Sequence, residues 1–327
     1  MTPPPIRWGI LGTGRIAGIF AEGLTALSDA KLVAVGSRTA ESAQRFASKF
    51  NVPRVHASYA ALANDPEVDA IYVATPHTSH MDDTIRCIQA GKAVLCEKPF
   101  AVNAGQAQQM IAAAKAANVP LMEAMWTRFL PAVRKAISLI NEGAIGDIRM
   151  IQSDFGFRTD VNPSGRLFDK NLAGGGLMDV GVYCVSLSVM ILGAAHSATG
   201  LADIGSTGVD EQAAAVMAFD GGRLAYFSTG VRTSTPMEAT ILGTEGWIRI
   251  ESPWFVANKL TLHKGGKSEV IDMPFVGNGY NYEAAEVGRL IREKKIESDV
   301  MSWTDTMRTM EAMDRIRAVW GLRYPME

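Results

Sequence analysis

The first third of the chain alternates short apolar runs with segments whose apolar residues recur at helical spacing. Strand and helix in alternation predict parallel strands with right-handed crossovers, a doubly wound sheet of the Rossmann type. The predicted strands are Ile6–Leu11, Lys31–Ser37, Arg54–Ala57, Ala70–Ala74, Ala93–Cys96 and Pro120–Glu123, and the predicted helices are Arg15–Leu27, Ala40–Phe50, Tyr59–Ala63, His80–Ala90 and Asn103–Ala117.

After residue 125 the pattern changes to alternating apolar and polar positions joined by short glycine turns, such as Asp220-Gly221-Gly222. This pattern predicts a mostly antiparallel sheet. The predicted strands are Ile148–Gly156, Ser197–Ile204, Gln212–Phe219, Arg223–Gly230, Met237–Gly243, Gly246–Ile250, Lys259–Lys264 and Ser268–Met273, and the predicted helices are Ala132–Glu142, Leu177–Leu192, Tyr282–Glu293 and Trp303–Trp320.

These patterns divide the chain of 327 residues into two domains. We expect an α/β dinucleotide-binding domain over residues 1–125, and an α+β domain with a large, open, mostly antiparallel sheet over residues 126–327. One face of an open sheet needs cover, and a second copy of the chain is the expected cover. The second domain is therefore expected to bind substrate and to form a homodimer or higher homo-oligomer.

Composition excludes several classes of partner. Hydrophobic residues make up 47% of the chain, charged residues 20%, and the net charge is −2, so no electrostatic case exists for nucleic acid or an anionic membrane. No uncharged apolar run reaches the roughly 18 residues of a membrane span. The N-terminus lacks a basic segment followed by an apolar one, so we expect no signal peptide and a cytoplasmic protein.

The cysteines and histidines indicate neither disulfides nor a metal site. Cys87, Cys96 and Cys184 are widely spaced, and Cys184 lies in an apolar run that predicts a core position. His77 and His80 are three residues apart, but no further ligand follows at metal-binding spacing. We expect reduced thiols and no metal.

A glycine-rich turn follows the first predicted strand. Gly12, Gly14 and Ala17 have the G-x-G-x-x-A spacing that allows a tight turn, close approach of a pyrophosphate, and close packing of helix on strand. The phosphates are expected at the helix N-terminus, where unpaired N–H groups favour negative charge. The expected cofactor contacts in this turn are Gly12, Thr13, Gly14, Arg15 and Ile16.

The end of the second predicted strand discriminates between the two nicotinamide dinucleotides. NAD enzymes usually place an acid about 20 residues past the glycines, to accept from the ribose 2′-hydroxyl. This chain has Ser37-Arg38-Thr39 there instead. A hydroxyl and a guanidinium suit a 2′-phosphate, so Ser37 and Arg38 favour NADP.

The tripeptide Glu97-Lys98-Pro99 follows a predicted strand at the carboxyl edge of the sheet, where doubly wound folds bind ligands. Together with this Rossmann start it resembles the Gfo/Idh/MocA family of oxidoreductases, and the resemblance covers essentially the whole chain. It extends to the segments 74–80 and 174–183. The segments 94–99, 123–131 and 181–185 are most similar to the branch of dimeric dihydrodiol dehydrogenases and NADP-dependent D-xylose 1-dehydrogenases.

The resemblance implies a catalytic centre at Lys98, with Asp179 and Tyr183 opposite it. Asp179 and Tyr183 are four residues apart on a predicted helix and would share one face. The resemblance also implies further cofactor or active-site contacts at Thr75, Pro76, His77, His80, Glu97, Lys98, Trp126 and Arg128. His77 stands where many relatives have asparagine, a departure from the family's pattern.

The implied reaction is hydride transfer between nicotinamide and a secondary alcohol or hemiacetal carbon of a cyclic polyol, either an aldose such as D-xylose or a trans-dihydrodiol. One side chain must accept the hydroxyl proton. Tyr183 is the first candidate, because a lysine ammonium nearby would favour its phenolate; exchanged roles for Lys98 and Tyr183 stay open. The alternatives are a sugar-ketone reductase, such as a 1,5-anhydrofructose reductase, and a non-catalytic NADP-binding sensor. Glucose–fructose oxidoreduction is disfavoured by the missing export signal.

Overall fold

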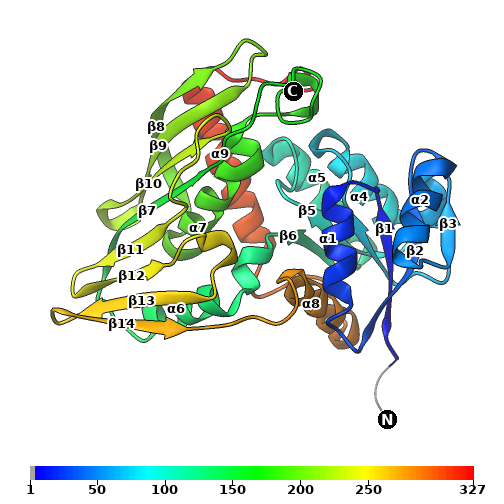
Figure 1. The fold of residues 1–327 in the computed structure, drawn as a ribbon, viewed down its shortest axis with the longest axis horizontal. Coiled ribbons are helices and arrows are strands. Elements are labelled where there is room, and N and C mark those ends of the chain that lie inside the picture. Colours follow the sequence, from blue (N-terminus) through cyan, green and yellow to red (C-terminus); the bar gives the residue numbers. More distant parts are fainter. Residues whose placement is uncertain (1–3) are drawn as a thin grey trace. The chain divides into compact units, whose positions relative to one another are not determined.

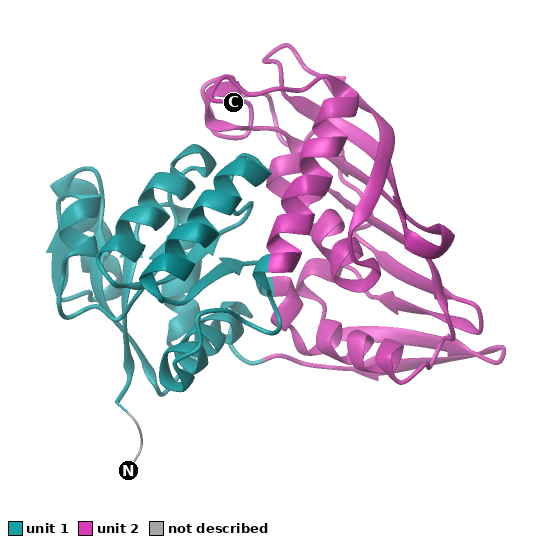
Figure 2. Ribbon diagram, turned by 180° about the vertical axis from the view of Figure 1, so that it is seen from behind, with its two compact units in different colours: residues 1–126, 276–303 teal, residues 127–275, 304–327 magenta. Residues whose placement is uncertain are grey.

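The structure is a computed structural model that describes residues 4–327. The chain forms two compact units, which Figure 2 shows in different colours. The first comprises the chain up to Trp126 together with Val276–Trp303, and the second comprises Thr127–Phe275 and Thr304–Glu327. The prediction of no signal peptide rests partly on residues 1–3, which lie outside the described residues.

Within the described part of the first unit, six parallel strands form a sheet in the order β3-β2-β1-β4-β5-β6 (Figure 1). The strands are β1 Ile6–Leu11, β2 Ala30–Gly36, β3 Arg54–His56, β4 Ala70–Val73, β5 Ala93–Glu97 and β6 Leu121–Ala124. The helices are α1 Arg15–Leu24, α2 Ala40–Phe50, α3 Tyr59–Ala63, α4 His80–Gln89, α5 Ala104–Ala117 and α8 Tyr280–Glu293.

The order of this sheet reverses between β1 and β4. The chain runs outward from β1 to β3, then returns to lay β4 against the other side of β1. Right-handed crossovers in opposite directions place helices on both faces, so every residue of β4 and β5 is buried. Ligands of doubly wound folds bind at the carboxyl ends of the strands beside such a reversal. The prediction of a Rossmann-type sheet is confirmed.

One predicted domain boundary needs correction, because residues 276–303 belong to the first unit and not to the second. Helix α8 buries Ala284, Val287 and Leu290, and it packs against α1 and β5. The Asn278 side chain donates to the carbonyl oxygen of Ile19 at 2.8 Å. Amphipathic spacing predicts the helix but not the sheet that it covers, because that choice depends on tertiary contacts.

In the second unit an eight-stranded, mostly antiparallel sheet runs in the order β14-β13-β12-β11-β7-β10-β9-β8 over the described residues, as predicted. Only the pairing of β7 with β10 is parallel within it. The strands are β7 Ile148–Gly156, β8 Ala195–Ile204, β9 Asp210–Phe219, β10 Arg223–Gly230, β11 Ala239–Gly243, β12 Gly246–Ile250, β13 Lys259–Lys264 and β14 Lys267–Asp272.

Helices cover one face of this sheet. Helix α6 (Pro131–Asn141) contacts β12 and β13, while α7 (Val182–Leu192) contacts β7 and β10. The last helix, α9, spans Trp303–Trp320. On β8, β9 and β10 the alternate positions Leu201, Val216 and Tyr226 are exposed, and their pairing places them on one common face.

The segment Lys170–Leu192 is apolar and long enough to cross a membrane by length and composition. Asp179 interrupts it, which is why no uncharged run of this length is visible in the sequence. In its most apolar window, 83% of the residues are buried inside the protein. Such burial is the usual condition of a core helix in a globular protein.

Candidate active site

The glycine turn between β1 and α1 has the geometry of a phosphate-binding turn. Gly12 has φ +107°, and a Cβ there would lie 2.6 Å from the carbonyl oxygen of Ala74, so only glycine fits. Gly14 precedes α1 and has open space where its Cβ would stand. No described side chain caps this helix, which leaves its N-terminal N–H groups facing that space.

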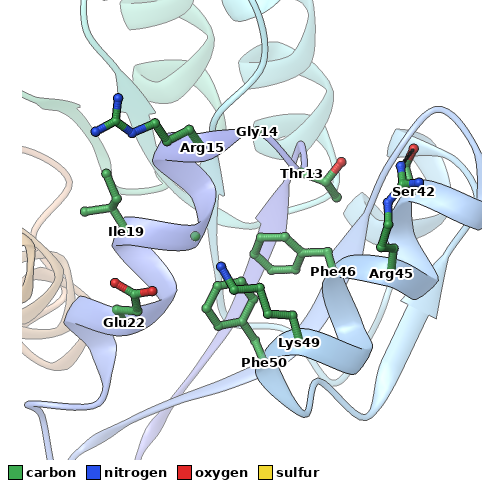
Figure 3. A pocket seen from close by; sticks show the side chains of 11 residues that line it. Thr13, Gly14, Arg15, Ile19, Glu22, Ser42, Arg45, Phe46, Lys49 and Phe50 are labelled. Atoms are coloured by element: carbon green, nitrogen blue, oxygen red, sulfur yellow. Dashed lines mark hydrogen bonds between the residues drawn. The ribbon is translucent and has the colours of Figure 1, made fainter.

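A hollow of about 340 Å³ lies beside the turn, between α1 and α2 (Figure 3). Thr13, Gly14 and Arg15 line it from the turn, and Ser42, Arg45 and Lys49 line it from α2. Residues 42, 45 and 49 are three and four apart, so they share one face of α2. These three residues were not among the predicted cofactor contacts, although their spacing on one helix face is visible in the sequence.

Ser37 and Arg38 follow β2 as predicted. Ser37 is buried, and its hydroxyl lies 3.5 Å from the hydroxyl of Thr13. Arg38 is exposed at the start of the connection to α2. Thr39 then accepts a hydrogen bond from the backbone N–H of Ser42 and begins α2. The end of β2 is therefore followed by the hydroxyls of Ser37 and Thr39 and the exposed guanidinium of Arg38, with no acid at position 37 or 38.

His80 was predicted beside the cofactor, and both of its ring nitrogens lie close to backbone carbonyl oxygens. The side chain is fully buried, with Nδ1 2.9 Å from the carbonyl oxygen of Pro99 and Nε2 2.9 Å from that of Thr75. Burial lowers the pKa of His80 to about 4, so the ring is neutral and donates one hydrogen bond at a time. His80 holds the Thr75-Pro76-His77 turn beside the Lys98-Pro99 loop. Thr75 and His77 are themselves buried.

Lys98 lies at the carboxyl end of β5, where the carboxylate of Glu97 and the phenol of Tyr72 support its backbone. Tyr72 is fully buried and donates a hydrogen bond to the carboxylate of Glu97. Glu97 Oε2 in turn accepts the backbone N–H of Lys98 at 3.0 Å. Within the segment 92–100, Lys98 alone is partly exposed, and its neighbours are buried. Lys98 is thus the partly exposed residue at this edge of the sheet, and its backbone is held by the buried side chains of Glu97 and Tyr72.

The acids behind Lys98 are strongly affected by burial. Glu283 of α8 is fully buried, and both of its carboxylate oxygens lack a hydrogen-bond partner among the described residues. Burial raises the pKa of Glu283 well above its usual value, and the negative charge of Glu97 raises it further. Both effects favour the protonated, neutral form of Glu283. Burial likewise raises the pKa of Tyr72, so the phenol stays protonated and remains a donor.

Trp126 and Arg128 have different environments. The indole of Trp126 stacks on the ring of Tyr280 with centroids 4.5 Å apart, inside the first unit. Arg128 belongs to the second unit and is only 2% exposed. Its guanidinium donates to the hydroxyl and carbonyl oxygens of Ser186 at 3.0 Å each, and it pairs with Asp305 at 2.6 Å. The contact of Arg128 with the cofactor or active site stays a prediction, and its buried guanidinium pairs with residues of α7 and α9.

Asp179 and Tyr183 both lie at the start of the helical segment that leads into α7. Residues Leu177–Gly181 form a π-helix, and α7 continues from Val182, so the predicted α-helix over Leu177–Leu192 begins with a different winding. Asp179 pairs with Arg166 at 2.7 Å. The ring of Tyr183 lies beside Phe155, with centroids 5.3 Å apart. Arg166 was missed because it lies in a loop without periodic spacing.

Lys98 belongs to the first unit, and Asp179 and Tyr183 belong to the second. Each unit therefore presents its own part of the predicted catalytic set. Among residues 4–327, no group of three or more histidine, cysteine or acidic residues is arranged to hold a metal ion. All three cysteines are buried and free, and Cys184 lies in the core as predicted.

Comparison with known proteins identifies the family. Residues 6–125 match the oxidoreductase family with an NAD-binding Rossmann fold, Gfo/Idh/MocA, and residues 133–249 match the C-terminal domain of the same family. The chain is 36% identical to the trans-1,2-dihydrobenzene-1,2-diol dehydrogenase of Mus musculus, 37% to that of Xenopus laevis and 32% to that of Homo sapiens. Each match covers 98% of this chain and 99% of the relative.

Solved structures agree on the fold. The aldose-aldose oxidoreductase from Caulobacter crescentus complexed with glycerol superposes with a TM-score of 0.87 at 24% identity, covering 96% of this chain and 97% of that one. KijD10, a 3-ketoreductase from Actinomadura kijaniata in complex with NADP and TDP-benzene, superposes with a TM-score of 0.86 at 24% identity, covering 97% and 98%. With both of its family domains matched, the chain belongs to the Gfo/Idh/MocA family of oxidoreductases.

Proposed function

We propose that this oxidoreductase transfers a hydride between NADP and a secondary alcohol or hemiacetal carbon of a cyclic polyol. The observation that carries the proposal is the full-length similarity, at 32–37% identity, to enzymes named for oxidation of a trans-dihydrodiol. A trans-1,2-dihydrodiol is therefore the first substrate class, and an aldose such as D-xylose is the second. We assign NADP binding to the first unit and substrate binding to the second.

The residues of the first unit fit NADP. The open space at Gly14 and the N-terminus of α1 suit the pyrophosphate. Ser37, Arg38 and the cationic side chains Arg45 and Lys49 suit the 2′-phosphate and its surroundings. Arg45 pairs with the exposed Glu41 at 3.2 Å, a surface contact weak enough to be exchanged for a phosphate.

The mechanism assigns one step to each member of the catalytic set. NADP, when bound, supplies nicotinamide C4 as the hydride acceptor or donor. In oxidation, the substrate C–H bond breaks with its electron pair, while Tyr183 accepts the hydroxyl proton and a carbonyl forms. In reduction, Tyr183 returns that proton to the oxygen. Lys98 orients the substrate oxygen and favours the phenolate by its charge, and Asp179 holds a second substrate hydroxyl.

The second candidate is a sugar-ketone reductase. The solved structures named for a 3-ketoreductase and for an aldose-aldose oxidoreductase share this fold. The same set would serve it, with Tyr183 as proton donor. A non-catalytic NADP-binding sensor is the third candidate. The presence of Lys98, Asp179 and Tyr183 together argues against a sensor, because binding alone requires no proton-transfer group.

A substrate panel separates these candidates. Purified enzyme with NADP⁺ is given trans-1,2-dihydrodiols and aldoses, enzyme with NADPH is given sugar ketones, and absorbance at the reduced-nicotinamide band is followed. We expect oxidation of a dihydrodiol or an aldose. Turnover confined to the ketones would favour the reductase. Tight NADP binding without turnover on any of them would favour the sensor.

We further propose that two copies pair through the helix-free face of the second unit's sheet. Leu201, Val216 and Tyr226 are exposed on it, with Leu201 84% exposed, beside a hollow of about 620 Å³. Sedimentation should give twice the 35.2 kDa of one chain. Leu201→Asp should give one chain mass, and Val276→Asp, exposed in the first unit, should leave the pair intact. A wild-type protein that sediments as one chain contradicts this.

A cytoplasmic location is likewise proposed, supported by three buried free thiols among the described residues.

A further inference from the structure

The buried carboxyl of Asp210 lies directly under the helical segment that carries Asp179 and Tyr183. Asp210 is the first residue of β9 and is fully buried. Its Oδ2 accepts the backbone N–H of Leu177 at 2.6 Å. Leu177 begins the π-helix, so this contact satisfies one of the N–H groups that a helix start leaves unpaired. The link joins residues 33 positions apart in the chain.

The glycines that precede the π-helix leave space for the carboxyl of Asp210. Gly175 has φ +117°, and a Cβ there would lie 2.1 Å from Asp210 Oδ1. A Cβ at Gly176 would lie 3.4 Å from Asp210 Oδ2, and the carbonyl oxygens of Gly174 and Gly176 accept hydrogen bonds from elsewhere in the unit. The hydroxyl of Tyr324 donates to the carbonyl oxygen of Gly174 at 2.7 Å, and that of Thr229 donates to Gly176 at 3.3 Å. Gly175 and Gly176 thus leave room for the carboxyl of Asp210, whereas a Cβ at Gly174 would meet the backbone of Arg166 and Leu167.

Few charges face Asp210. The guanidinium of Arg317, from α9, acts on it from one side, and Tyr324 of the C-terminal segment lies near it. Arg317 is itself paired with Asp314 and Glu327. Burial raises the pKa of Asp210 to about 7, although its backbone hydrogen bonds and the charge of Arg317 oppose the rise. Its Oδ1 has no hydrogen-bond partner within residues 4–327.

We infer that Asp210 is a positioning residue, which seats the start of the α7 segment so that Asp179 and Tyr183 meet the substrate in a fixed geometry. The inference rests on the proposed role of Tyr183 in proton transfer. Asp210 acts through the amide of Leu177 and does not itself touch substrate or cofactor. A neutral acceptor of the same shape is sufficient for this task, because the hydrogen bond needs only an oxygen lone pair.

The kinetic test compares three variants with wild type at pH 6.5. Asp210→Ala removes the acceptor, and we expect kcat to fall about tenfold or more, as expected for a displaced catalytic group, while Kd for NADP changes less than about twofold. Asp210→Asn keeps the acceptor and should restore kcat to within about threefold of wild type.

Thr229→Val is the matched control. It removes a weaker hydrogen bond to the same turn and should lower kcat less than Asp210→Ala does. Full kcat in Asp210→Ala, or equal losses in the Ala and Asn variants, overturns the inference.

Hydrogen exchange gives a readout that needs no substrate. Opening the turn hydrates Asp210 and lowers its pKa, so wild-type protection of amides 177–184 should fall between pH 5 and 7, by up to about tenfold per pH unit after correction for intrinsic rates. Asp210→Asn should show no such dependence, and amides of α5 should show none in either protein. Equal pH dependence in wild type and Asp210→Asn overturns the inference, even if Asp210→Ala does not fold. If wild type oxidises and reduces nothing while this exchange pattern holds, the proposed function fails and the seating of the helix stands.

Discussion

The phenol of Tyr72 donates a hydrogen bond to the carboxylate of Glu97, and both side chains lie inside the first unit. The same carboxylate accepts the backbone N–H of Lys98, so the orientation of the lysine loop is set from below by a buried tyrosine. Tyr72 is held in turn by Phe20, whose ring stacks on it with centroids 3.8 Å apart. The stacking of Phe20 on Tyr72 in the core thereby helps to fix the backbone of Lys98, the proposed catalytic residue.

Tyr72→Phe should lower stability and turnover together. The substitution removes the hydroxyl donor to the buried carboxylate of Glu97, and hydrogen bonds to charged groups contribute about 1.5–3 kcal/mol. We expect a loss of this size in the free energy of unfolding by urea, with a lower kcat. Tyr282→Phe is the control, because its hydroxyl accepts an exposed hydrogen bond from Val276, and it should cost about 1 kcal/mol or less. Equal effects of the two substitutions would contradict this support for Lys98.

The two glycines of the nucleotide turn should respond differently to alanine. Gly14→Ala adds a methyl group to open space, so the free energy of unfolding should change by less than about 1 kcal/mol while NADP binding is lost. Gly12→Ala meets the carbonyl oxygen of Ala74 and a positive φ, so it should lower both stability and binding. Urea unfolding and NADP titration by calorimetry check the pair. Retained NADP affinity in Gly14→Ala would show that no phosphate lies there.

Arg38→Ala should weaken NADP much more than NAD. A guanidinium that binds a 2′-phosphate contributes about 1.5–3 kcal/mol, so Kd for NADP⁺ should rise about 10- to 100-fold with little change for NAD⁺. Arg86→Ala is a suitable control, since Arg86 pairs with Asp83 on α4. Calorimetric titration of both dinucleotides measures the effect. Equal losses for NADP⁺ and NAD⁺ would exclude the phosphate role of Arg38.

Asp210→Asn should change how stability depends on pH. The folded pKa of about 7 is above the ordinary value of about 3.9, so the unfolded chain releases this proton first as pH rises. The contribution of Asp210 to the free energy of unfolding of wild type is therefore full below about pH 4. It is lost as pH rises to 7, by at most about 1.4 kcal/mol per pH unit. Urea unfolding at pH 5, 6, 7 and 8 should show the variant gaining on wild type up to pH 7. A constant difference across this range would contradict the buried acid.

The Rossmann half was predictable because its determinants are local. Strands such as β4 are buried on both faces, and a strand in that position needs a continuous apolar run. Gly12 is required by its own backbone angle and by one neighbouring strand, so its spacing to Gly14 carries the information. The family resemblance added Lys98, Asp179 and Tyr183, which periodicity alone would have assigned to a loop and to an apolar helix.

Other features depend on contacts between distant residues and were missed or wrong. The amphipathic pattern of α8 does not specify which sheet it covers, so residues 276–303 were assigned to the wrong unit. The seat of the π-helix depends on Asp210, 33 residues after Leu177. The buried partners of His80 and Arg128, which are backbone carbonyl oxygens and the side chains of Ser186 and Asp305, were likewise not predicted. Sequence spacing does not show where a polar atom finds its partner.

Tyr183 is proposed to accept the substrate proton, and Lys98 to orient the substrate oxygen, as the hydride passes to NADP⁺. The most direct test is single-turnover reduction of NADP⁺ by Lys98→Ala and Tyr183→Phe on the substrate that wild type oxidises. We expect the rate of the chemical step to fall about 100-fold or more in each variant, as for loss of a general acid or base, while Kd for NADP⁺ stays within about threefold. Wild-type rates in either variant would contradict the account.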